Sequence, residues 1–201
     1  MIRVVFFDLG GVIVRTEFQA PRQHLAERLG LEYNDVVKAV FESETSHQAS
    51  IGAISEDEHW AAVMHRLHLP ASETQAVKHE FFAGDLTDIK LLNYIRELRK
   101  TLKVGLISNA WSGLRPWIVE EKFDDAFDAM IISAEIGMAK PDARIYQIAL
   151  EKLGVTPAEA ILLDDFPKNV EGARAVGMAA IYFTQPDKAL DELKRLLANH
   201  R

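Results

Sequence analysis

Five short apolar runs along the chain have the pattern of β-strands that are buried on both faces. They are rich in β-branched and aromatic residues and lack polar alternation, which is typical of a parallel sheet covered by helices. The runs are Arg3–Phe7, Lys103–Ile107, Ala129–Ser133, Ala160–Leu163 and Ala179–Phe183. Apolar stripes at helical spacing alternate with them, at residues 91–102, 145–153 and 190–197. This alternation predicts an α/β fold, a three-layer, Rossmann-like, doubly wound parallel sheet.

One long stretch interrupts the alternation. Between residues 19 and 83 helical patterns recur and no strand pattern is evident, with helix starts expected at Asn34, at Ser55–Glu58 and at Ser72. A crossover helix needs only about a dozen residues, so this stretch predicts a separate subdomain of four helices. We therefore expect a core of residues 1–18 and 84–201 and a helical cap of residues 19–83. An insert after the first strand lies over the carboxyl ends of the strands, where open α/β sheets bind ligands.

Composition narrows the classes of function. The 201 residues carry a formal net charge of -7, which disfavours binding to nucleic acid through phosphate contacts. The chain has no cysteine, so disulfides, thiolate zinc sites and iron–sulfur clusters are excluded. No run approaches the roughly 18 apolar residues of a membrane span. We expect a cytoplasmic protein without a membrane partner, as a monomer or a homodimer.

Polar residues follow four of the predicted strands, in the order Asp8, Ser108 with Asn109, Lys140, and Asp164 with Asp165. Because the carboxyl ends of parallel strands share one edge of a sheet, three carboxylates are expected to converge there. Carboxylates a few ångströms apart repel one another and raise one another's pKa. A divalent cation relieves that repulsion, and hard carboxylate oxygens suit Mg²⁺. The pattern therefore predicts a magnesium site.

The remaining residues at this edge suit a phosphate group. Lys140 adds a positive charge, and Ser108 and Asn109 offer hydroxyl, amide and backbone donors, which together fit a tetrahedral dianion. A carboxylate in such a pocket can act as a nucleophile. These features predict Mg²⁺-assisted phosphoryl transfer from a small phosphorylated metabolite to an aspartate. Dinucleotide binding is rejected, because Gly10 and Gly11 lead into a strand-like run with no third glycine.

The motifs, in this order and spacing, resemble those of the haloacid dehalogenase-like (HAD) hydrolase superfamily, over essentially the whole chain. The insert resembles the small α-helical cap that one subgroup carries between motifs one and two. Three segments are similar to sugar-phosphate phosphatases and to the phosphatase domains linked to epoxide hydrolases. They are FDLGGVIV at residues 7–14, GMAKP at residues 137–141 and the pair Asp164-Asp165.

The resemblance implies a role for each acidic residue. Asp8 would be the nucleophile and would also face the metal. Asp165 and the main-chain carbonyl of Gly10 would bind Mg²⁺ directly. Asp164 would support the metal from behind its ligands or through water.

The resemblance also implies the phosphate contacts. Ser108 and Asn109 would hold the phosphoryl oxygens, and Lys140 would neutralise the nucleophile and the transferring group. Asn169, four residues after Asp165, would form hydrogen bonds nearby.

One position departs from the family's pattern. Most phosphatases of the superfamily carry a second aspartate two residues after the nucleophile, which protonates the leaving oxygen and then activates water. That position is Gly10 here, and general acid–base help is worth roughly 10²–10⁴-fold in rate. An activated leaving group, such as that of a sugar 1-phosphate, needs less protonation. Alternatively, a nearby side chain supplies the acid, and His47, Arg15 and Glu17 are the candidates by position.

Two other functions stay open. A 2-haloacid dehalogenase of the same superfamily also lacks the second aspartate and works without metal, although it would have no use for Asp164 and Asp165. A catalytically weak phosphate-binding protein is the other alternative, because Gly10 removes the usual general acid and base.

Overall fold

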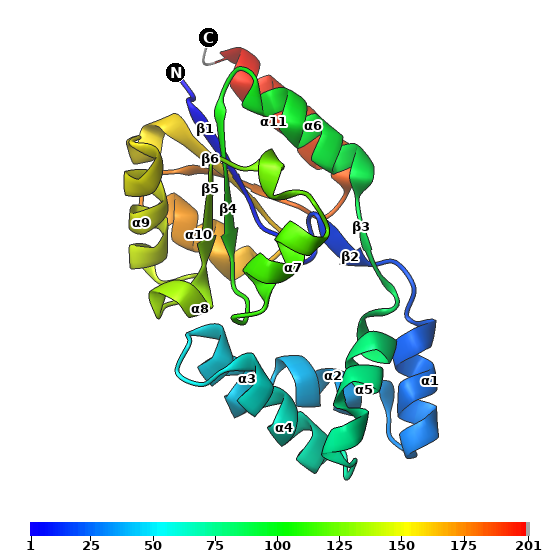
Figure 1. Ribbon diagram of the computed structural model, residues 1–201. Coiled ribbons are helices and arrows are strands. Elements are labelled where there is room, and N and C mark those ends of the chain that lie inside the picture. The colour runs from blue at the N-terminus through cyan, green and yellow to red at the C-terminus, as the bar shows by residue number, and fades with distance from the viewer. Residues whose placement is uncertain (200–201) are drawn as a thin grey trace.

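The computed structural model describes residues 1–199 and has a five-stranded parallel sheet at its centre (Figure 1). The strand order is β5-β4-β1-β6-β7. The strands are β1 (Val4–Phe7), β4 (Lys103–Ser108), β5 (Ala129–Ile132), β6 (Ala160–Asp164) and β7 (Ala179–Tyr182). All five lie within a residue or two of the expected runs. Burial on both faces is the reason these segments are continuously apolar.

Helices cover both faces of the sheet, which confirms the expected three-layer, doubly wound architecture. Val5 and Phe7 point into one apolar layer, beneath α6 (Ile89–Arg99), α7 (Leu114–Glu120) and α11 (Pro186–Asn199). Val4 and Phe6 point into the other, beneath α9 (Ala143–Leu153) and α10 (Pro167–Ala175). Short elements complete the core, namely η2 (Asp124–Ala126), α8 (Ser133–Ile136) and η3 (Pro157–Glu159).

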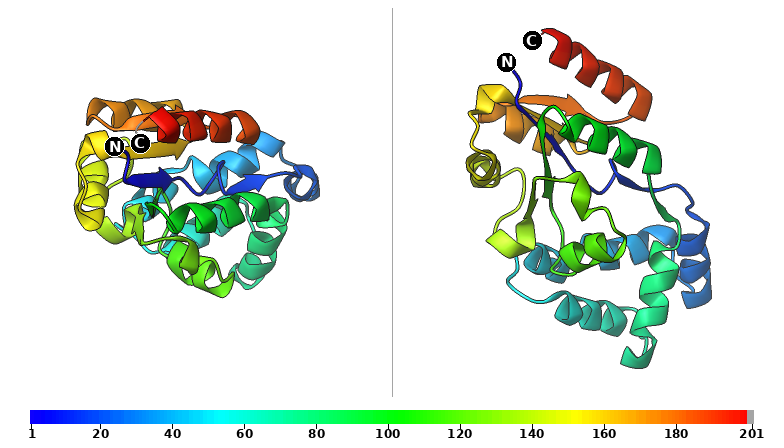
Figure 2. Two further views of the ribbon diagram at one scale, coloured as in Figure 1. Left: turned by 90° about the horizontal axis from the view of Figure 1, so that it is seen from above. Right: turned by 45° about the horizontal axis from the view of Figure 1, so that its top comes forward.

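The stretch inserted after the first strand folds as a bundle of helices beyond the carboxyl ends of the strands (Figure 2, right). Its helices are α1 (Ala20–Leu29), α2 (Tyr33–Phe41), α3 (Glu44–Ser50), α4 (Glu56–Arg66), η1 (Ala71–Glu73) and α5 (Thr74–Phe82). It has an apolar core of its own, in which Trp60 and Phe81 are fully buried. The expectation of four α-helices was wrong by one. Helix α3 has seven residues, most of them polar, and gives no apolar stripe in the sequence.

The helix starts expected in this bundle have mixed outcomes. The capping box at Ser55 and Glu58 is confirmed, because each side chain bonds to the other residue's backbone N–H. The expected caps at Asn34 and Ser72 were wrong. Helix α2 begins at Tyr33, and Ser72 lies inside η1, so both residues are already within helical turns.

A two-stranded antiparallel ribbon joins the bundle to the core. Strand β2 (Val14–Thr16) pairs with β3 (Asp85–Thr87), one on each of the two chain connections. The ribbon lies next to both boundaries of the cap expected at residues 19–83, and that division stays a prediction. Among the helices described, none combines the length and the apolar character needed to span a bilayer.

Candidate active site

Three carboxylates meet at the carboxyl edge of the sheet. Asp8 follows β1, and Asp164 and Asp165 lie at the end of β6. Because β1 and β6 are neighbours with Phe7 opposite Leu163, the register brings these acids together. Each residue offers an oxygen, and these oxygens lie within 4.8 Å of one another. The expected convergence of carboxylates is confirmed.

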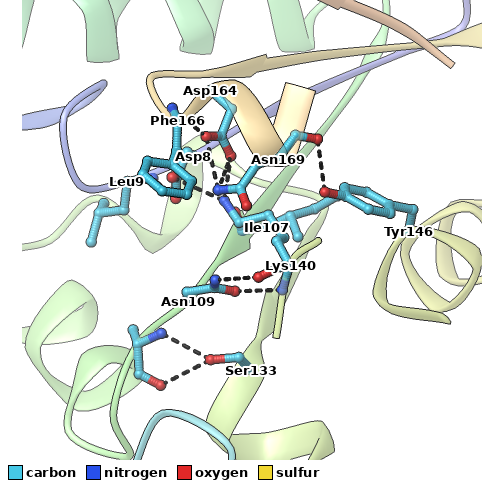
Figure 3. Close-up of polar contacts among 11 residues, drawn as sticks. Asp8, Leu9, Ile107, Asn109, Ser133, Lys140, Tyr146, Asp164, Phe166 and Asn169 are labelled. Atoms are coloured by element: carbon cyan, nitrogen blue, oxygen red, sulfur yellow. Dashed lines mark hydrogen bonds and ion pairs between the residues drawn. The ribbon is translucent and has the colours of Figure 1, made fainter. Parts of the chain in front are cut away.

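Lys140 lies against two of these carboxylates, Asp8 and Asp164, and its side chain is completely buried (Figure 3). Its ammonium nitrogen is 2.9 Å from Asp8 Oδ2 and 2.6 Å from Asp164 Oδ2. It also donates to the carbonyl of Ile107 at 2.8 Å. An ammonium group has three protons to donate, so these three acceptors hold the lysine in one position. One cation therefore supports the nucleophile candidate and the acid behind it.

The cluster carries more negative charge than Lys140 can balance. Burial raises the pKa of Asp8, and the neighbouring Asp164 raises it further, while Lys140 opposes both effects. Burial and Asp164 also raise the pKa of Asp165. With all three carboxylates ionised, one ammonium leaves two negative charges in a largely buried space. A divalent cation would neutralise the remainder.

The donor set fits a hard divalent cation such as Mg²⁺. Carboxylate oxygens are the ligands that Mg²⁺ prefers in proteins. Asn169 lies behind them and donates from Nδ2 to both oxygens of Asp164, at 3.0 and 3.2 Å. Its buried Oδ1 has no partner among residues 1–199. A buried acceptor without a donor is costly, and a water held by a cation in this cluster could satisfy it.

Backbone geometry distinguishes the two glycines after Asp8. Gly11 has a φ of 75°, a left-handed conformation that favours glycine. A Cβ at Gly11 would collide with the carboxylate of Asp165, whereas a Cβ at Gly10 would meet nothing within 4 Å. Gly11 therefore makes room for Asp165, and Gly10 leaves an open space beside the cluster.

The residues after β4 brace the lysine. Ser108 is buried at the end of that strand. The side chain of Asn109 accepts from the backbone N–H of Lys140 at 2.8 Å and donates to its carbonyl at 2.9 Å. This use of the Asn109 amide was not foreseen from sequence. Both polar atoms of its side chain are thus bound to the backbone of Lys140.

Two further side chains and one backbone N–H support the site and were missed from sequence. The hydroxyl of Ser133, at the end of β5, bonds to both the N–H and the carbonyl of Ala110, at 2.9 and 3.2 Å. Tyr146 donates to the carbonyl of Asn169 at 2.8 Å. Leu9 was also missed, because its backbone N–H, which donates to Asp8 Oδ1 at 2.7 Å, has no sequence signal. The position of Ser133 at a strand end is a signal that could have found it.

The three side chains considered as a substitute acid lie elsewhere in the contacts described for residues 1–199. Arg15 donates to Glu17 at 3.1 Å and to Asp88 at 2.9 Å, which binds it into the ribbon between core and bundle. His47 is exposed on α3. None of these contacts joins them to the three carboxylates.

Comparison with known proteins defines the class. Residues 2–177 match the haloacid dehalogenase-like hydrolase family. The chain therefore belongs to this family of hydrolases, as the strand-end motifs indicated.

Several relatives are named as phosphatases. A sesquiterpene phosphatase of Aspergillus oryzae is 28% identical over 197 residues, covering 97% of this chain and 96% of that protein. A D-ribitol-5-phosphate phosphatase of Bacteroides thetaiotaomicron is 27% identical and covers 95% of each chain. Bifunctional epoxide hydrolase 2 of Sus scrofa is 28% identical over 97% of this chain, which spans only 39% of that protein's length.

Solved structures share the fold. A HAD family enzyme of Bacteroides thetaiotaomicron, in complex with magnesium and inorganic phosphate, has a TM-score of 0.76 at 19% identity, covering 92% of this chain and 95% of that one. An L-2-haloacid dehalogenase of Xanthobacter autotrophicus has a TM-score of 0.67 at 21% identity, covering 90% and 76%. A HAD enzyme solved with phosphate and a dehalogenase thus share this architecture, so the fold alone does not distinguish their reactions.

Proposed function

We propose that the protein is a Mg²⁺-dependent phosphatase that hydrolyses small phosphate monoesters, with Asp8 as its nucleophile. The observation that carries this proposal is the position of Asp8. Its carboxylate is bound by Lys140 and by the Leu9 N–H, in contact range of Asp164 and Asp165. A metal-free reaction has no need for two further carboxylates at that point. The phosphatase names of the full-length relatives support the same class of reaction.

The acidic cluster supports one division of roles. Asp8, Asp165 and the carbonyl of Gly10 would hold Mg²⁺, which supplies positive charge to the transferring phosphoryl group. Asp164 is fully buried and bound by Lys140 and Asn169. Its part would be to fix the lysine and to support the metal from behind.

The reaction would proceed in two displacements at phosphorus. An oxygen of Asp8 attacks the phosphorus atom and the ester P–O bond breaks, which gives an aspartyl phosphate and a leaving oxygen that takes up a proton. Water then attacks the same phosphorus atom, which releases inorganic phosphate and a proton and restores the Asp8 carboxylate. Lys140 holds Asp8 in place and offsets charge in both displacements.

The phosphoryl oxygens would be bound by Ser108, by Lys140 and by the backbone N–H of Asn109. Ser108 ends β4 and Asn109 follows it, whereas Lys140 follows the neighbouring β5 after the short helix α8. The side chain of Asn109 would act through Lys140, because both of its amide atoms are bound to that residue's backbone.

Sugar phosphates are the substrate class that we favour. A bundle of helices beyond the carboxyl edge suits small phosphorylated metabolites. One relative is named for D-ribitol-5-phosphate. Gly10 provides no acid for the leaving oxygen, so substrates with good leaving groups should react fastest.

An assay of phosphate release tests the proposal. Sugar phosphates, nucleotides and an aryl phosphate would be incubated with Mg²⁺ or with EDTA, using wild type and Asp8→Asn. Asp191→Asn is the matched control, because Asp191 is exposed on α11 and pairs with Lys194. We expect release that requires both Mg²⁺ and Asp8 and that Asp191→Asn leaves unchanged.

The alternatives give different results in the same assay. Chloride release from 2-haloacids in EDTA would indicate a dehalogenase instead. Mg²⁺-dependent binding of inorganic phosphate without turnover of any ester would indicate a weak phosphate-binding protein.

A further inference from the structure

The loop after β4, residues 109–113, connects the helical bundle to the lysine of the site. At its start Asn109 is bound to the backbone of Lys140, and Lys140 is bound to Asp8. Ser133 fixes the next residue, Ala110, through two hydrogen bonds, both drawn in Figure 3. This half of the loop is therefore held by the core.

The other half of the loop is held by the bundle. Trp111 packs against the bundle's apolar core rather than that of the sheet. Its ring centroid lies 4.5 Å from that of His59 and 5.9 Å from that of Phe41, on which it stacks. The Trp60 ring meets it edge-on at 6.1 Å. Aromatic pairs at these distances are favourable beyond the apolar area they bury.

A charged contact lies beside the aromatic one. Glu56, at the first position of α4, accepts from the backbone N–H of Gly113 at 3.0 Å and from the ammonium of Lys78 at 2.7 Å. A Cβ at Gly113 would collide with the Glu56 carboxylate where it lies, so the present contact needs a residue without a side chain at that position. The lysine comes from α5, so two helices of the bundle fix this carboxylate.

We propose that Trp111 and Glu56 are positioning residues that hold the phosphate-binding loop in its working geometry. They act through Asn109, whose side-chain amide is bound to the backbone of Lys140 and whose backbone N–H would bind the phosphoryl group. If the bundle moved away from this loop, Trp111 would lose its aromatic contacts and Gly113 would lose its hydrogen bond to Glu56. The geometry of the loop therefore depends on its contact with the bundle. The inference rests on the proposed function.

Variants of both residues test this inference. Trp111→Ala and Trp111→Phe would be compared with Trp117→Phe, because Trp117 follows the same loop but packs on Phe123 in the core. Glu56→Gln would be compared with Asp57→Asn, an exposed acid in the same first turn of α4. Each pair thus makes the same kind of change, once at a side chain that joins the loop to the bundle and once at a side chain that does not.

The readouts separate positioning from mere stability. They are the Kd of inorganic phosphate in saturating Mg²⁺, the affinity for Mg²⁺, and kcat and KM on two esters with different leaving groups. A displacement of about 1 Å in a site can cost about 100-fold, so we expect losses in kcat/KM of up to about 100-fold for Trp111→Ala and smaller ones for Trp111→Phe and Glu56→Gln. The losses should be equal for both esters, phosphate binding should weaken, and Mg²⁺ affinity should not change.

Opposite results would overturn the inference. Phosphate affinity and kcat/KM within twofold of wild type in Trp111→Phe and Glu56→Gln would do so, even if Trp111→Ala fails to fold. Equal losses in the control variants would also do so, because they would show a general loss of stability. A wild-type protein that neither binds phosphate nor hydrolyses any ester would overturn the proposed function together with this inference. An active wild type with unaffected variants would overturn the inference alone.

Discussion

The absence of a side chain at Gly11 allows the Asp165 carboxylate to lie beside it. The left-handed backbone of Gly11 and the adjacent Asp165 carboxylate leave no room for a side chain at this position. We predict that Gly11→Ala displaces Asp165 and weakens Mg²⁺ binding at least tenfold, because Asp165 is an expected metal ligand. Calorimetric titration with Mg²⁺ measures this directly.

Gly10→Ala is the matched control for that variant. A Cβ there meets nothing within 4 Å, and Gly10 is not among the residues with positive φ. Its Mg²⁺ affinity should stay near that of wild type. Equal losses in both variants would show that the Asp165 contact is not the cause.

The open space at Gly10 gives a second prediction at this scale. Gly10→Asp would place a carboxylic acid beside the phosphoryl site without a steric clash at Cβ. General acid help is worth roughly 10²–10⁴-fold, and substrates with poor leaving groups need it most. We expect kcat on an alkyl phosphate to rise by at least tenfold relative to kcat on an aryl phosphate. An unchanged ratio of the two rates would show that the wild-type site already supplies the proton.

At the residue scale, the strand-end rule predicted the acidic cluster and the approach of Lys140 to it. The three acids end or follow adjacent buried strands, so the register of the sheet brings them together. Lys140 reaches them through the segment after β5 and α8, which the register does not determine. The double hydrogen bond of Asn109 to Lys140 and the support from Ser133 could not be predicted. They depend on the path of loops whose backbone conformation has no periodic signal.

At the scale of elements, a buried ion pair fixes the ribbon to the bundle. Arg22 of α1 donates to both oxygens of Asp85 in β3, at 2.8 and 2.7 Å, and its guanidinium lies 4.3 Å from the centroid of the Phe81 ring. Removing one partner of a buried pair leaves an uncompensated charge and costs about 3–5 kcal/mol. We predict that Asp85→Ala lowers the free energy of unfolding by about 3 kcal/mol, measured by denaturant titration.

An exposed pair provides the comparison. Glu97 and Lys100 lie on the surface of α6 with 68% of each side chain exposed. Such pairs contribute about 0–1 kcal/mol, so Glu97→Ala should change the free energy of unfolding by less than about 1 kcal/mol. If Asp85→Ala lowered the free energy of unfolding by no more than Glu97→Ala does, the Arg22 pair would not stabilise the ribbon.

Helices and strands with many apolar residues could be predicted from the sequence, whereas short or polar ones could not. Every core strand gave a signal, because burial on two faces requires an unbroken apolar run. Helix α3 gave none, since two of its seven residues are buried and both are small or polar. Only one strand of the ribbon could be predicted. The run after Gly11 is strand-like, whereas its partner Asp85–Thr87 is three residues long and mostly polar.

At the scale of the whole molecule, the contact between bundle and core could not be read from the sequence. Trp111 reads as a packing residue of the loop after β4, and nothing in its neighbours indicates that it completes the other subdomain's apolar core. Long-range contacts of this kind are specified by shape rather than by period. The sequence therefore indicates where the helical stretch is inserted, whereas the structure shows that Trp111, from the loop after β4, packs against that bundle's apolar core.

The stability of the whole molecule should report on the acidic cluster. Ligand bound only by the folded state stabilises it by about 2.7 kcal/mol at a concentration 100 times Kd. For a chain of this size about 1 kcal/mol corresponds to roughly 2–4 °C in Tm, so saturating Mg²⁺ should raise Tm by about 5–10 °C over EDTA.

Asp165→Asn separates this effect from a general influence of salt. Lys140 pairs with Asp8 and Asp164, and Asp165 adds a third carboxylate to the cluster, so removing its charge should relieve repulsion and raise Tm in EDTA above that of wild type. The same variant should lose most of the rise caused by Mg²⁺. Asp165→Asn would then have a higher Tm than wild type in EDTA and a lower Tm than wild type in Mg²⁺. The control Asp191→Asn should have the Tm of wild type in both conditions. Thermal unfolding that is identical for wild type and Asp165→Asn in both conditions would contradict a metal site at this edge of the sheet, whereas a reversal would show that the cluster costs stability until a cation is bound.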